Sequence, residues 1–497
     1  MKESTSLKRK TMVGLFWSFV DLSANHGIQF IIQIILARLL LPEHFGVIGM
    51  IIVFIALSES IVDSGFTQAL IRDQGTTQED YSTVFYFNLL IAILLYIILY
   101  FLAPIISAFF LEPELITIIR TLSVVLIINS LGIIQKVMLV KKVDFKTITK
   151  VSIIAVIISG SITIIFALMG FGVWSLVINI LSMQFLQVTL FWLFNRWIPS
   201  LKFNIKSFKK FFKFGYKLLL SGLIETFYNN LYFLIIGRMY STTQLGFYTN
   251  AIKIRDLASQ SIAAAVQRVS YPVLSSIQDD ERRLKSGFRK IIRMSAFINF
   301  PLLIGLAAIA VPLFSLLLGD KWLPSVVYFQ FLCLAGMLYP LHAINLNILQ
   351  VKGRSDLFLR LEIIKKAVLT VLIALSLWLG FGIMGLIGAA VANSYISLFI
   401  NTYFSAREIA YSAIEQMKDL LPVFVYSIIM GVAVFLLGEA LPFSNFIILS
   451  CQIVFGIAIY TIICKLAKVE EFEAISQFLV GSISRVRVAL LLILRKM

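Results

Sequence analysis

Charged residues are scarce in this chain of 497 residues. They make up 14% of it, whereas a soluble domain carries about 25%. Hydrophobic residues account for 59%, so the composition excludes an ordinary water-soluble protein and indicates one built for lipid. Cysteines are also few. Cys333, Cys451 and Cys464 stand in apolar runs without disulfide or metal-site spacing, so we interpret them as small core residues and expect no metal.

Catalytic and nucleotide-binding motifs are missing too. The chain contains no Walker A sequence, so ATP does not drive it directly. It contains neither a GxSxG nucleophile elbow nor an HExxH pair. We therefore expect a protein that is not an enzyme and has no cofactor, with coupling to H⁺ or Na⁺ left open.

Long apolar runs recur along the whole chain. A membrane helix needs roughly 20 mostly apolar residues, and this rule predicts fourteen spans. The first run is too long and too polar for a cleaved signal peptide, so we expect a retained helix. The expected limits are 13–39, 46–70, 83–109, 115–139, 150–169, 172–194, 216–237, 246–271, 291–318, 324–350, 358–379, 382–405, 418–437 and 443–464.

Lysine and arginine are distributed unevenly between the two ends of these spans. If the N-terminus is cytoplasmic, only Arg238 and Lys321 of the 43 basic residues fall in outer loops. This asymmetry follows the positive-inside rule, so most of the net charge of +17 reflects topology rather than a nucleic-acid partner. We expect both termini in the cytoplasm. The predicted outer loops are short, which leaves no room for an extracellular catalytic domain.

Two cytoplasmic segments are both basic and apolar. Residues 197–217 interleave phenylalanines with lysines. Such a segment can bind single-stranded nucleic acid, but beside a membrane we interpret it as lying on anionic lipid. Residues 472–497 form an amphipathic tail that we expect to lie in the membrane interface rather than to cross it.

A signature occurs twice, with an offset of 200 residues. Ala37-Arg38 is followed eight residues later by Gly46, and Gly237-Arg238 by Gly246. The turn GFGV at 170–173 returns as GFGI at 380–383, with an offset of 210 residues. Each repeat then contains six spans, an even number, so both copies enter the membrane from the same side.

The expected fold is an all-α integral membrane protein of about 14 transmembrane helices. Two parallel six-helix repeats would form two lobes around a central cavity, followed by two further helices. The predicted divisions are an N-terminal lobe (1–195), a C-terminal lobe (196–411), the last two spans (412–466) and a cytoplasmic amphipathic tail (467–497).

Polar side chains recur at intervals of four within several predicted spans, which places them on one face of a helix. An ion at the centre of a membrane helix costs roughly 2.5–3.5 kcal/mol, so these faces must line a wet cavity or pair with one another. For the acids we favour a cavity with an ion-coupling role. For any single Asn or Gln, a hydrogen bond between helices is an equal alternative. The candidates are Asp21, Asn25, Gln29, Glu59, Asp63, Glu225, Asn229, Asp256 and Gln260.

Two basic residues lie within the eighth predicted span. Lys253 and Arg255 are candidates for binding a phosphate-bearing substrate, because arginine suits bidentate phosphate contacts. The alternative is a structural ion pair with Asp256, and the sequence does not separate the two.

The motifs together resemble a known family. IILARLLLPEHFGVIGM, VDSGFTQALIR (62–72), LVKKVDF and the block from Leu245 to Ile277 are similar in order and spacing to the polysaccharide-exporter branch of the MOP superfamily. The resemblance covers essentially residues 10–465. It implies fourteen helices in two lobes, and flipping of an undecaprenyl-pyrophosphate-linked oligosaccharide across the bacterial inner membrane. Polysaccharide polymerase or assembly proteins are further partners that the family leaves open. It supplies no fixed set of site residues.

Two alternatives remain. A multidrug or metabolite exporter of the same superfamily would need the acids but not the basic pair. A membrane glycan ligase or polymerase would need an acceptor-facing loop, and the short outer turns disfavour one.

Overall fold

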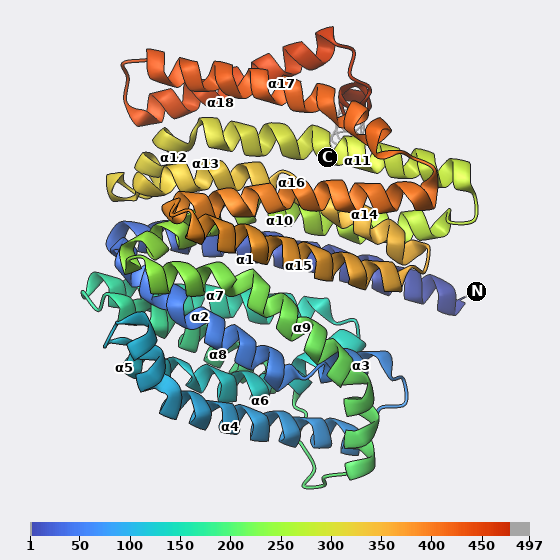
Figure 1. Cartoon of the computed structure of the whole chain (residues 1–497). Coiled ribbons are helices and arrows are strands. Elements are labelled where there is room, and N and C mark those ends of the chain that lie inside the picture. The colour runs from blue at the N-terminus through green and yellow to red at the C-terminus, as the bar shows by residue number, and fades with distance from the viewer. Residues whose placement is uncertain (1, 478–497) are drawn as a thin grey trace, which may run out of the picture. The chain divides into compact units, whose positions relative to one another are not determined.

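The computed structural model describes residues 2–477, and within this range every regular element is a helix (Figure 1). This confirms the all-α prediction. The part of the predicted amphipathic tail beyond residue 477 lies outside the described residues. The elements are α1 (Lys2–Leu39), α2 (Pro42–Asp63), α3 (Phe66–Arg72), α4 (Gln78–Phe110), α5 (Leu115–Leu122), α6 (Val124–Lys141), α7 (Phe145–Leu168), α8 (Val173–Asn195), α9 (Ile205–Met239), α10 (Thr242–Ser276), α11 (Glu281–Ala308), α12 (Ala310–Leu317), a 3₁₀ turn (Asp320–Trp322), α13 (Pro324–Gly336), α14 (Tyr339–Val351), α15 (Ser355–Trp378), α16 (Gly382–Ile409), α17 (Ala413–Ala440) and α18 (Asn445–Leu466).

Eleven stretches of the described chain are long and apolar enough to cross a membrane. Each overlaps one of the predicted spans. The remaining three predicted spans coincide with α1, α10 and α15, which are single continuous helices. In these three helices polar or charged side chains interrupt the apolar run, as Lys365 and Lys366 do in α15. The total of fourteen spans stays a prediction.

Several helices begin at side chains that cap them. Thr77 Oγ1 accepts a hydrogen bond from the Asp80 amide at 3.3 Å, and Asp80 Oδ2 accepts one from the Thr77 amide at 2.9 Å. Ser412 and Glu415 form the same reciprocal arrangement at the start of α17. These caps satisfy amide groups that have no partner within the helix, so they fix where α4 and α17 begin.

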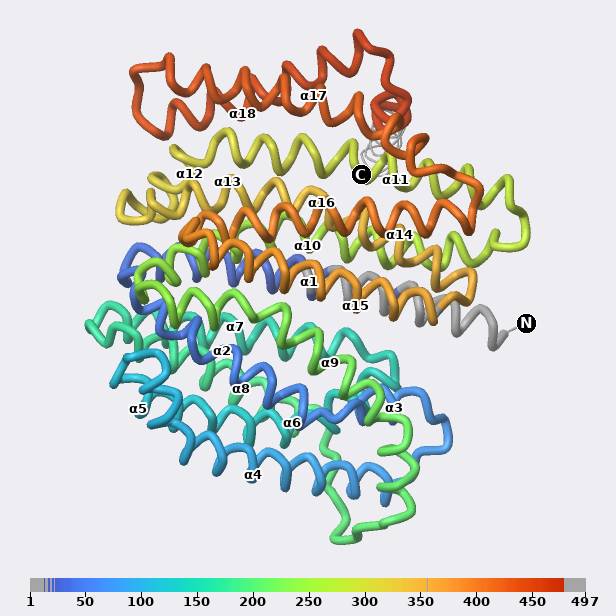
Figure 2. Tube along the Cα trace, viewed as in Figure 1, coloured from blue at the N-terminus to red at the C-terminus, as the bar shows by residue number. Residues whose placement is uncertain are grey.

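The second predicted span is not one helix. It breaks between α2 and α3 at Ser64 and Gly65, whose φ angles of 47° and 69° are left-handed. The break lies where the backbone of α9 comes close, since a Cβ on Gly65 would lie 2.7 Å from the Gly215 carbonyl oxygen. α9 changes direction where it passes α3 (Figure 2). Only glycine can adopt this backbone angle and also allow this close contact. The hydropathy of the sequence does not indicate the break.

The chain forms two compact units, and each is described by itself. The first contains residues up to Thr249 and the second begins at Asn250. In the first unit α1 packs on α7, α7 on α8, and α9 on α2 and α4. In the second unit α11 packs on α17 and α13, and α16 on α13, α14 and α15. The predicted division at residue 195 refers to the sequence repeat, and it stays a prediction.

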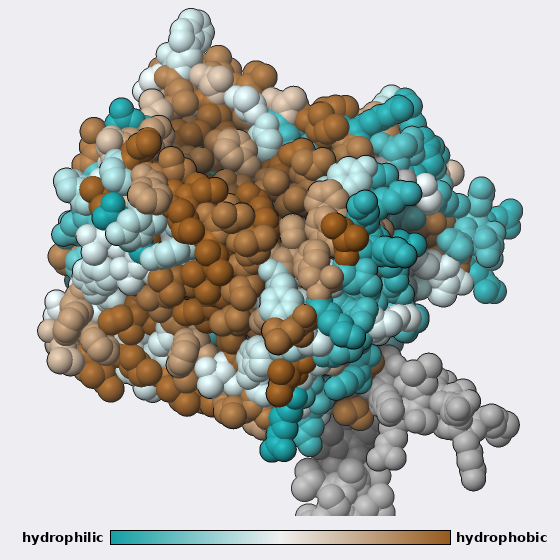
Figure 3. Space-filling view, turned by 90° about the horizontal axis from the view of Figure 1, so that it is seen from below, coloured by the Kyte–Doolittle hydropathy of each residue, from teal (hydrophilic) through white to brown (hydrophobic). Residues whose placement is uncertain are grey.

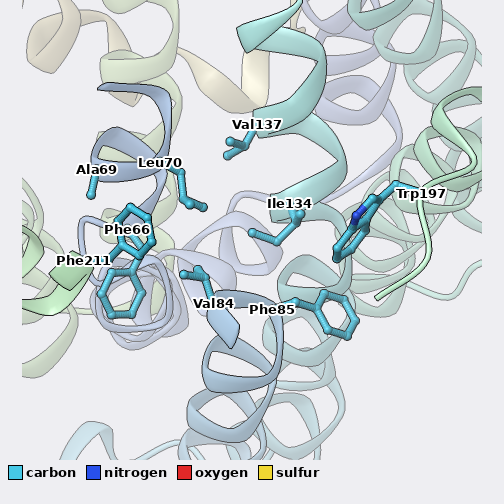
Figure 4. Packing of buried hydrophobic residues seen from close by; sticks show 9 residues of the cluster. All are labelled: Phe66, Ala69, Leu70, Val84, Phe85, Ile134, Val137, Trp197 and Phe211. Atoms are coloured by element: carbon cyan, nitrogen blue, oxygen red, sulfur yellow. The ribbon is translucent and has the colours of Figure 1, made fainter. Parts of the chain in front are cut away.

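A buried cluster of aromatic and aliphatic side chains holds part of the first unit together. It joins α3, α4, α6 and α9 with the segment that follows α8 (Figure 4). Trp197 Nε1 donates to Gln78 Oε1 at 2.6 Å, and Gln135 Nε2 donates to the Trp197 carbonyl at 2.8 Å. The members drawn are Phe66, Ala69, Leu70, Val84, Phe85, Ile134, Val137, Trp197 and Phe211.

One face of the molecule is broadly apolar and is bordered by hydrophilic residues (Figure 3). α4 alone exposes Leu90, Phe101 and Ile105 by 56%, 72% and 64%. Large apolar side chains so exposed would cost several kcal/mol in water, so α4 is suited to contact lipid.

The two signature glycines meet each other within the first unit. A Cβ on Gly46 would lie 1.8 Å from the Thr242 carbonyl oxygen, and a Cβ on Gly246 would lie 1.8 Å from the Pro42 carbonyl oxygen. Positions 42 and 242 differ by the same 200 residues as 46 and 246. The repeated signature therefore makes a reciprocal contact in which the first turns of α2 and α10 touch backbone to backbone.

Candidate functional site

A polar cavity of about 360 Å³ lies in the first unit between α2–α3, α6 and α8. We call it the N-terminal cavity. The predicted residues Glu59 and Asp63 both line it, and apolar side chains such as Phe191 complete its wall. The other polar residues of its lining are Thr67, Asn129, Lys136, Gln184 and Gln187.

Hydrogen bonds connect three helices across this cavity. Gln184 Nε2 on α8 donates to Asn129 Oδ1 on α6 at 2.9 Å. Asn129 Nδ2 donates in turn to Glu59 Oε1 on α2 at 3.3 Å. Thr67 Oγ1 donates to Asp63 Oδ1 beside them. The carboxylates are thus held by neutral donors, which supports charges away from bulk water.

Four polar residues of the cavity were not among the predicted site residues. Lys136 was counted only as a basic residue near the cytoplasm, and Asn129, Gln184 and Gln187 were not considered. Asn129, Ile133 and Lys136 follow one face of α6, and Gln184 and Gln187 follow one face of α8, because residues three or four apart share a face. That spacing was the available signal.

The polar stripe of α1 is separate from the cavity lining. Asn25 Nδ2 donates to Asp21 Oδ1 at 3.0 Å, a bond between adjacent turns of one helix. Gln29 is exposed. On α9, Glu225 and Asn229 are also exposed. None of these five residues lines the N-terminal cavity.

Arg255 and Asp256 form an ion pair in the second unit. Arg255 Nε lies 2.8 Å from Asp256 Oδ1, and the arginine side chain is 7% exposed. Its guanidinium lies 5.1 Å from the centre of the Tyr339 ring. This geometry favours the structural interpretation for Arg255. Lys253 and Gln260 are exposed on α10, so Lys253 is the more accessible of the two bases.

A second cavity, of about 370 Å³, lies in the second unit and is apolar. Side chains of α11, α16 and α17 line it, together with Leu338 from the turn between α13 and α14. Among the others are Phe300, Phe399 and Phe424. Lys418 is its one charged neighbour among the lining residues described. The cavity suits an aliphatic ligand rather than a polar one.

A loop between α3 and α4 carries a network of charged groups. Lys141 Nζ donates to the Asp73 carbonyl at 2.6 Å and to Thr76 Oγ1 at 2.7 Å. Lys210 pairs with the Asp73 carboxylate and holds the pKa of Asp73 below its usual value. The network ties the loop to α6 and α9.

A polar cavity embedded in a bundle of lipid-facing helices is the architecture of a membrane transporter. Within residues 2–477, no three His, Cys, Asp or Glu side chains gather closely enough to hold a metal ion. The chain belongs to the family described as polysaccharide biosynthesis protein, whose profile matches residues 35–327.

Known proteins resemble the chain over most of its length. It is 28% identical to the teichuronic acid biosynthesis protein TuaB of Bacillus subtilis (strain 168), over 71% of this chain and 73% of the relative. It is 25% identical to the lipopolysaccharide biosynthesis protein WzxC of Escherichia coli (strain K12), over 80% and 81%. The fold is similar to that of the lipid II flippase MurJ in an inward closed conformation. The TM-score is 0.72 and the identity 17%, over 92% of this chain and 98% of that one.

Proposed function

We propose that this protein flips a lipid-linked oligosaccharide from the cytoplasmic to the outer leaflet for export of a cell-surface polysaccharide. The observation that carries the proposal is membership of a polysaccharide biosynthesis family in a chain with the fold of a lipid II flippase. The absence of a catalytic motif from the sequence supports transport rather than bond formation. The carrier is undecaprenyl pyrophosphate, and the protein works in the bacterial inner membrane with both termini in the cytoplasm.

The mechanism we propose is alternating access between two six-helix lobes. Lys253 contacts the pyrophosphate directly, and Arg255, oriented by Asp256, adds positive charge beside it. The predicted polar residues of α1, α9 and α10, which are half-buried or exposed, line the passage between the leaflets. Their acids, Asp21 and Glu225, exchange H⁺ or Na⁺ against the substrate, and no organic cofactor takes part.

The apolar cavity supports the lipid half of this proposal. A prenyl chain is aliphatic, and the cavity walls, formed mainly by α11, α16 and α17, are almost wholly aliphatic and aromatic. We place part of the carrier chain there, because burial of apolar surface stabilises binding by roughly 25 cal/mol per Å².

The test is transport of a fluorescent undecaprenyl-pyrophosphate oligosaccharide in proteoliposomes, read by an impermeant quencher. Wild-type protein should move the label across the membrane, and K253Q should lower the rate without lowering the melting temperature. K321Q, in a predicted outer loop, is the matched control and should behave as wild type. Wild-type vesicles that export a cationic dye but leave the labelled lipid in place would instead indicate a drug exporter. Formation of new glycosidic bonds would indicate a ligase or polymerase.

A further inference from the structure

We infer that the N-terminal cavity binds one neutral sugar residue, a hexose or N-acetylhexosamine, of the transported glycan. The inference rests on the proposed function and adds a sugar subsite built wholly from the first unit. It depends on the size of the cavity, its chemistry, its charge and its depth in the membrane.

The volume of the cavity favours an organic ligand over a single ion. One water molecule takes up about 30 Å³ of liquid, so a single cation with a few waters would leave most of a cavity of about 360 Å³ unfilled. Pockets for small molecules begin at about 300 Å³. The N-terminal cavity therefore has room for a single sugar ring with bound water, and not for a long oligosaccharide.

The lining provides the groups that a sugar needs. Each sugar hydroxyl donates one hydrogen bond and accepts others, so carboxylates and amides in one cavity satisfy both functions. Glu59 and Asp63 accept, and Gln184 and Gln187 both donate and accept. Phe191 and the aliphatic side chains offer an apolar wall for the C–H face of the ring. The chain of bonds from Gln184 through Asn129 to Glu59 holds these groups in place before a ligand arrives.

The charge favours a neutral sugar. Two acids and one lysine line the cavity, so its net charge is negative when all three are ionised. Lys136 acts on Asp63 across the cavity, which leaves Glu59 without an opposing cation in the lining described. In that ionised state a phosphate or a uronate would be repelled here, whereas a neutral hydroxyl can hydrogen-bond to the carboxyl groups. The sugar and the pyrophosphate therefore bind at different places.

The cavity lies near the predicted cytoplasmic side. Asp63 is the last residue of α2, and the short helix α3 that follows it ends at the basic residue Arg72. Lys136 lies in the second half of α6, close to the basic residues that end it. This is the side on which a lipid-linked glycan starts its passage, so the subsite is suited to the loading of substrate.

Gln187 offers a specific perturbation. It is half-buried and lines the cavity, and it takes no part in the hydrogen bonds that join Gln184, Asn129 and Glu59. Gln187→Leu removes this amide at nearly constant volume and leaves the bonds among Gln184, Asn129 and Glu59 intact. Gln68→Leu is the matched control, because Gln68 is exposed on α3 outside the cavity lining.

The experiment uses the full chain, purified in detergent, and saturation-transfer NMR with glucose, N-acetylglucosamine and glucuronate. We expect wild type and Q68L to bind the two neutral sugars, and Q187L to bind about tenfold more weakly, as one lost hydrogen bond predicts. E59Q, with a lowered negative charge, should improve the relative binding of glucuronate.

Three results would overturn the inference. They are the absence of a signal from either neutral sugar with wild type, equal affinity of Q187L and wild type for these sugars, and an affinity of wild type for glucuronate equal to that for glucose. Vesicle assays separate this from the wider proposal. If wild type binds no free sugar and Q187L flips the labelled lipid at the wild-type rate, the sugar subsite is refuted and the flippase proposal stands. Wild type that flips nothing removes the flippase.

Discussion

The contact between the two signature glycines leads to a sharp prediction about stability. Gly46→Ala or Gly246→Ala would place a methyl group 1.8 Å from the carbonyl oxygen of the opposite helix. The first turns of α2 and α10 would have to separate by about 1–2 Å to restore ordinary van der Waals distance. Overpacking of this kind costs about 1–3 kcal/mol, although alanine by itself favours a helix.

The control for this prediction is Gly27→Ala. Gly27 lies inside α1, and a Cβ there would meet no atom within 4 Å. This substitution should stabilise the protein by up to about 1 kcal/mol, because alanine loses less backbone entropy than glycine in a helix. The two kinds of substitution therefore have opposite signs although the chemical change is the same.

The assay is the melting temperature of purified protein, measured by loss of the monomer peak after heating in detergent. G46A and G246A should melt below wild type, and G27A at or above it. The double variant G46A/G246A should lose less than the sum of the single variants, because helices already separated by one methyl group accommodate the second at lower cost. Single variants that melt at or above wild type would refute the backbone contact, and strict additivity would refute its reciprocity.

Three further predictions concern the charges and caps. Because Lys210 lowers the pKa of Asp73, the stabilisation is present above the ordinary aspartate value of about 3.9 and is lost as pH falls through the lowered pKa. The melting temperature of D73N should therefore fall less steeply at acid pH than that of wild type. Parallel curves of melting temperature against pH for the two proteins would contradict this. Ser412→Ala should lower the free energy of unfolding by about 1 kcal/mol, because Ser412 caps α17. Ser444→Ala should lower it little, because Ser444 precedes α18 without a side-chain cap. Equal losses of stability would contradict the role of the cap. Asp256→Asn removes the carboxylate that pairs with the buried Arg255 and should lower the free energy of unfolding by about 3 kcal/mol. Asp279→Asn, at an exposed position, should change it very little. A D256N variant as stable as wild type would show that the ion pair is dispensable.

The all-helical membrane architecture was readable from the sequence because transfer from water to lipid depends on local composition. A run such as residues 83–109 has few polar groups, so it must be a lipid-exposed or buried helix whatever its neighbours are. The structure agrees over α4. The break in the second span was not readable. It depends on Gly215, which lies 150 residues away from Gly65 in the chain and next to it in the fold.

Among the polar residues too, some were predictable from the sequence and others only from the tertiary structure. The cost of burying charge identified Glu59 and Asp63, because that cost applies to any ion in a membrane helix. It did not identify Gln184 or Gln187, which are inexpensive one by one and matter only where three helices meet. It left two interpretations of Arg255, and the position of Asp256 beside the guanidinium favours the ion pair.

By itself, then, the sequence determined that the chain is a bundle of membrane helices, predicted which ends face the cytoplasm, and revealed that a signature is used twice. Each of these follows from solvation and from periodicity along the chain. Only the tertiary structure decided that the two signature glycines touch, that α3 separates from α2, and that an amide relay encloses a cavity beside Glu59. Those features arise from contacts between distant segments, whose geometry no local rule of solvation contains.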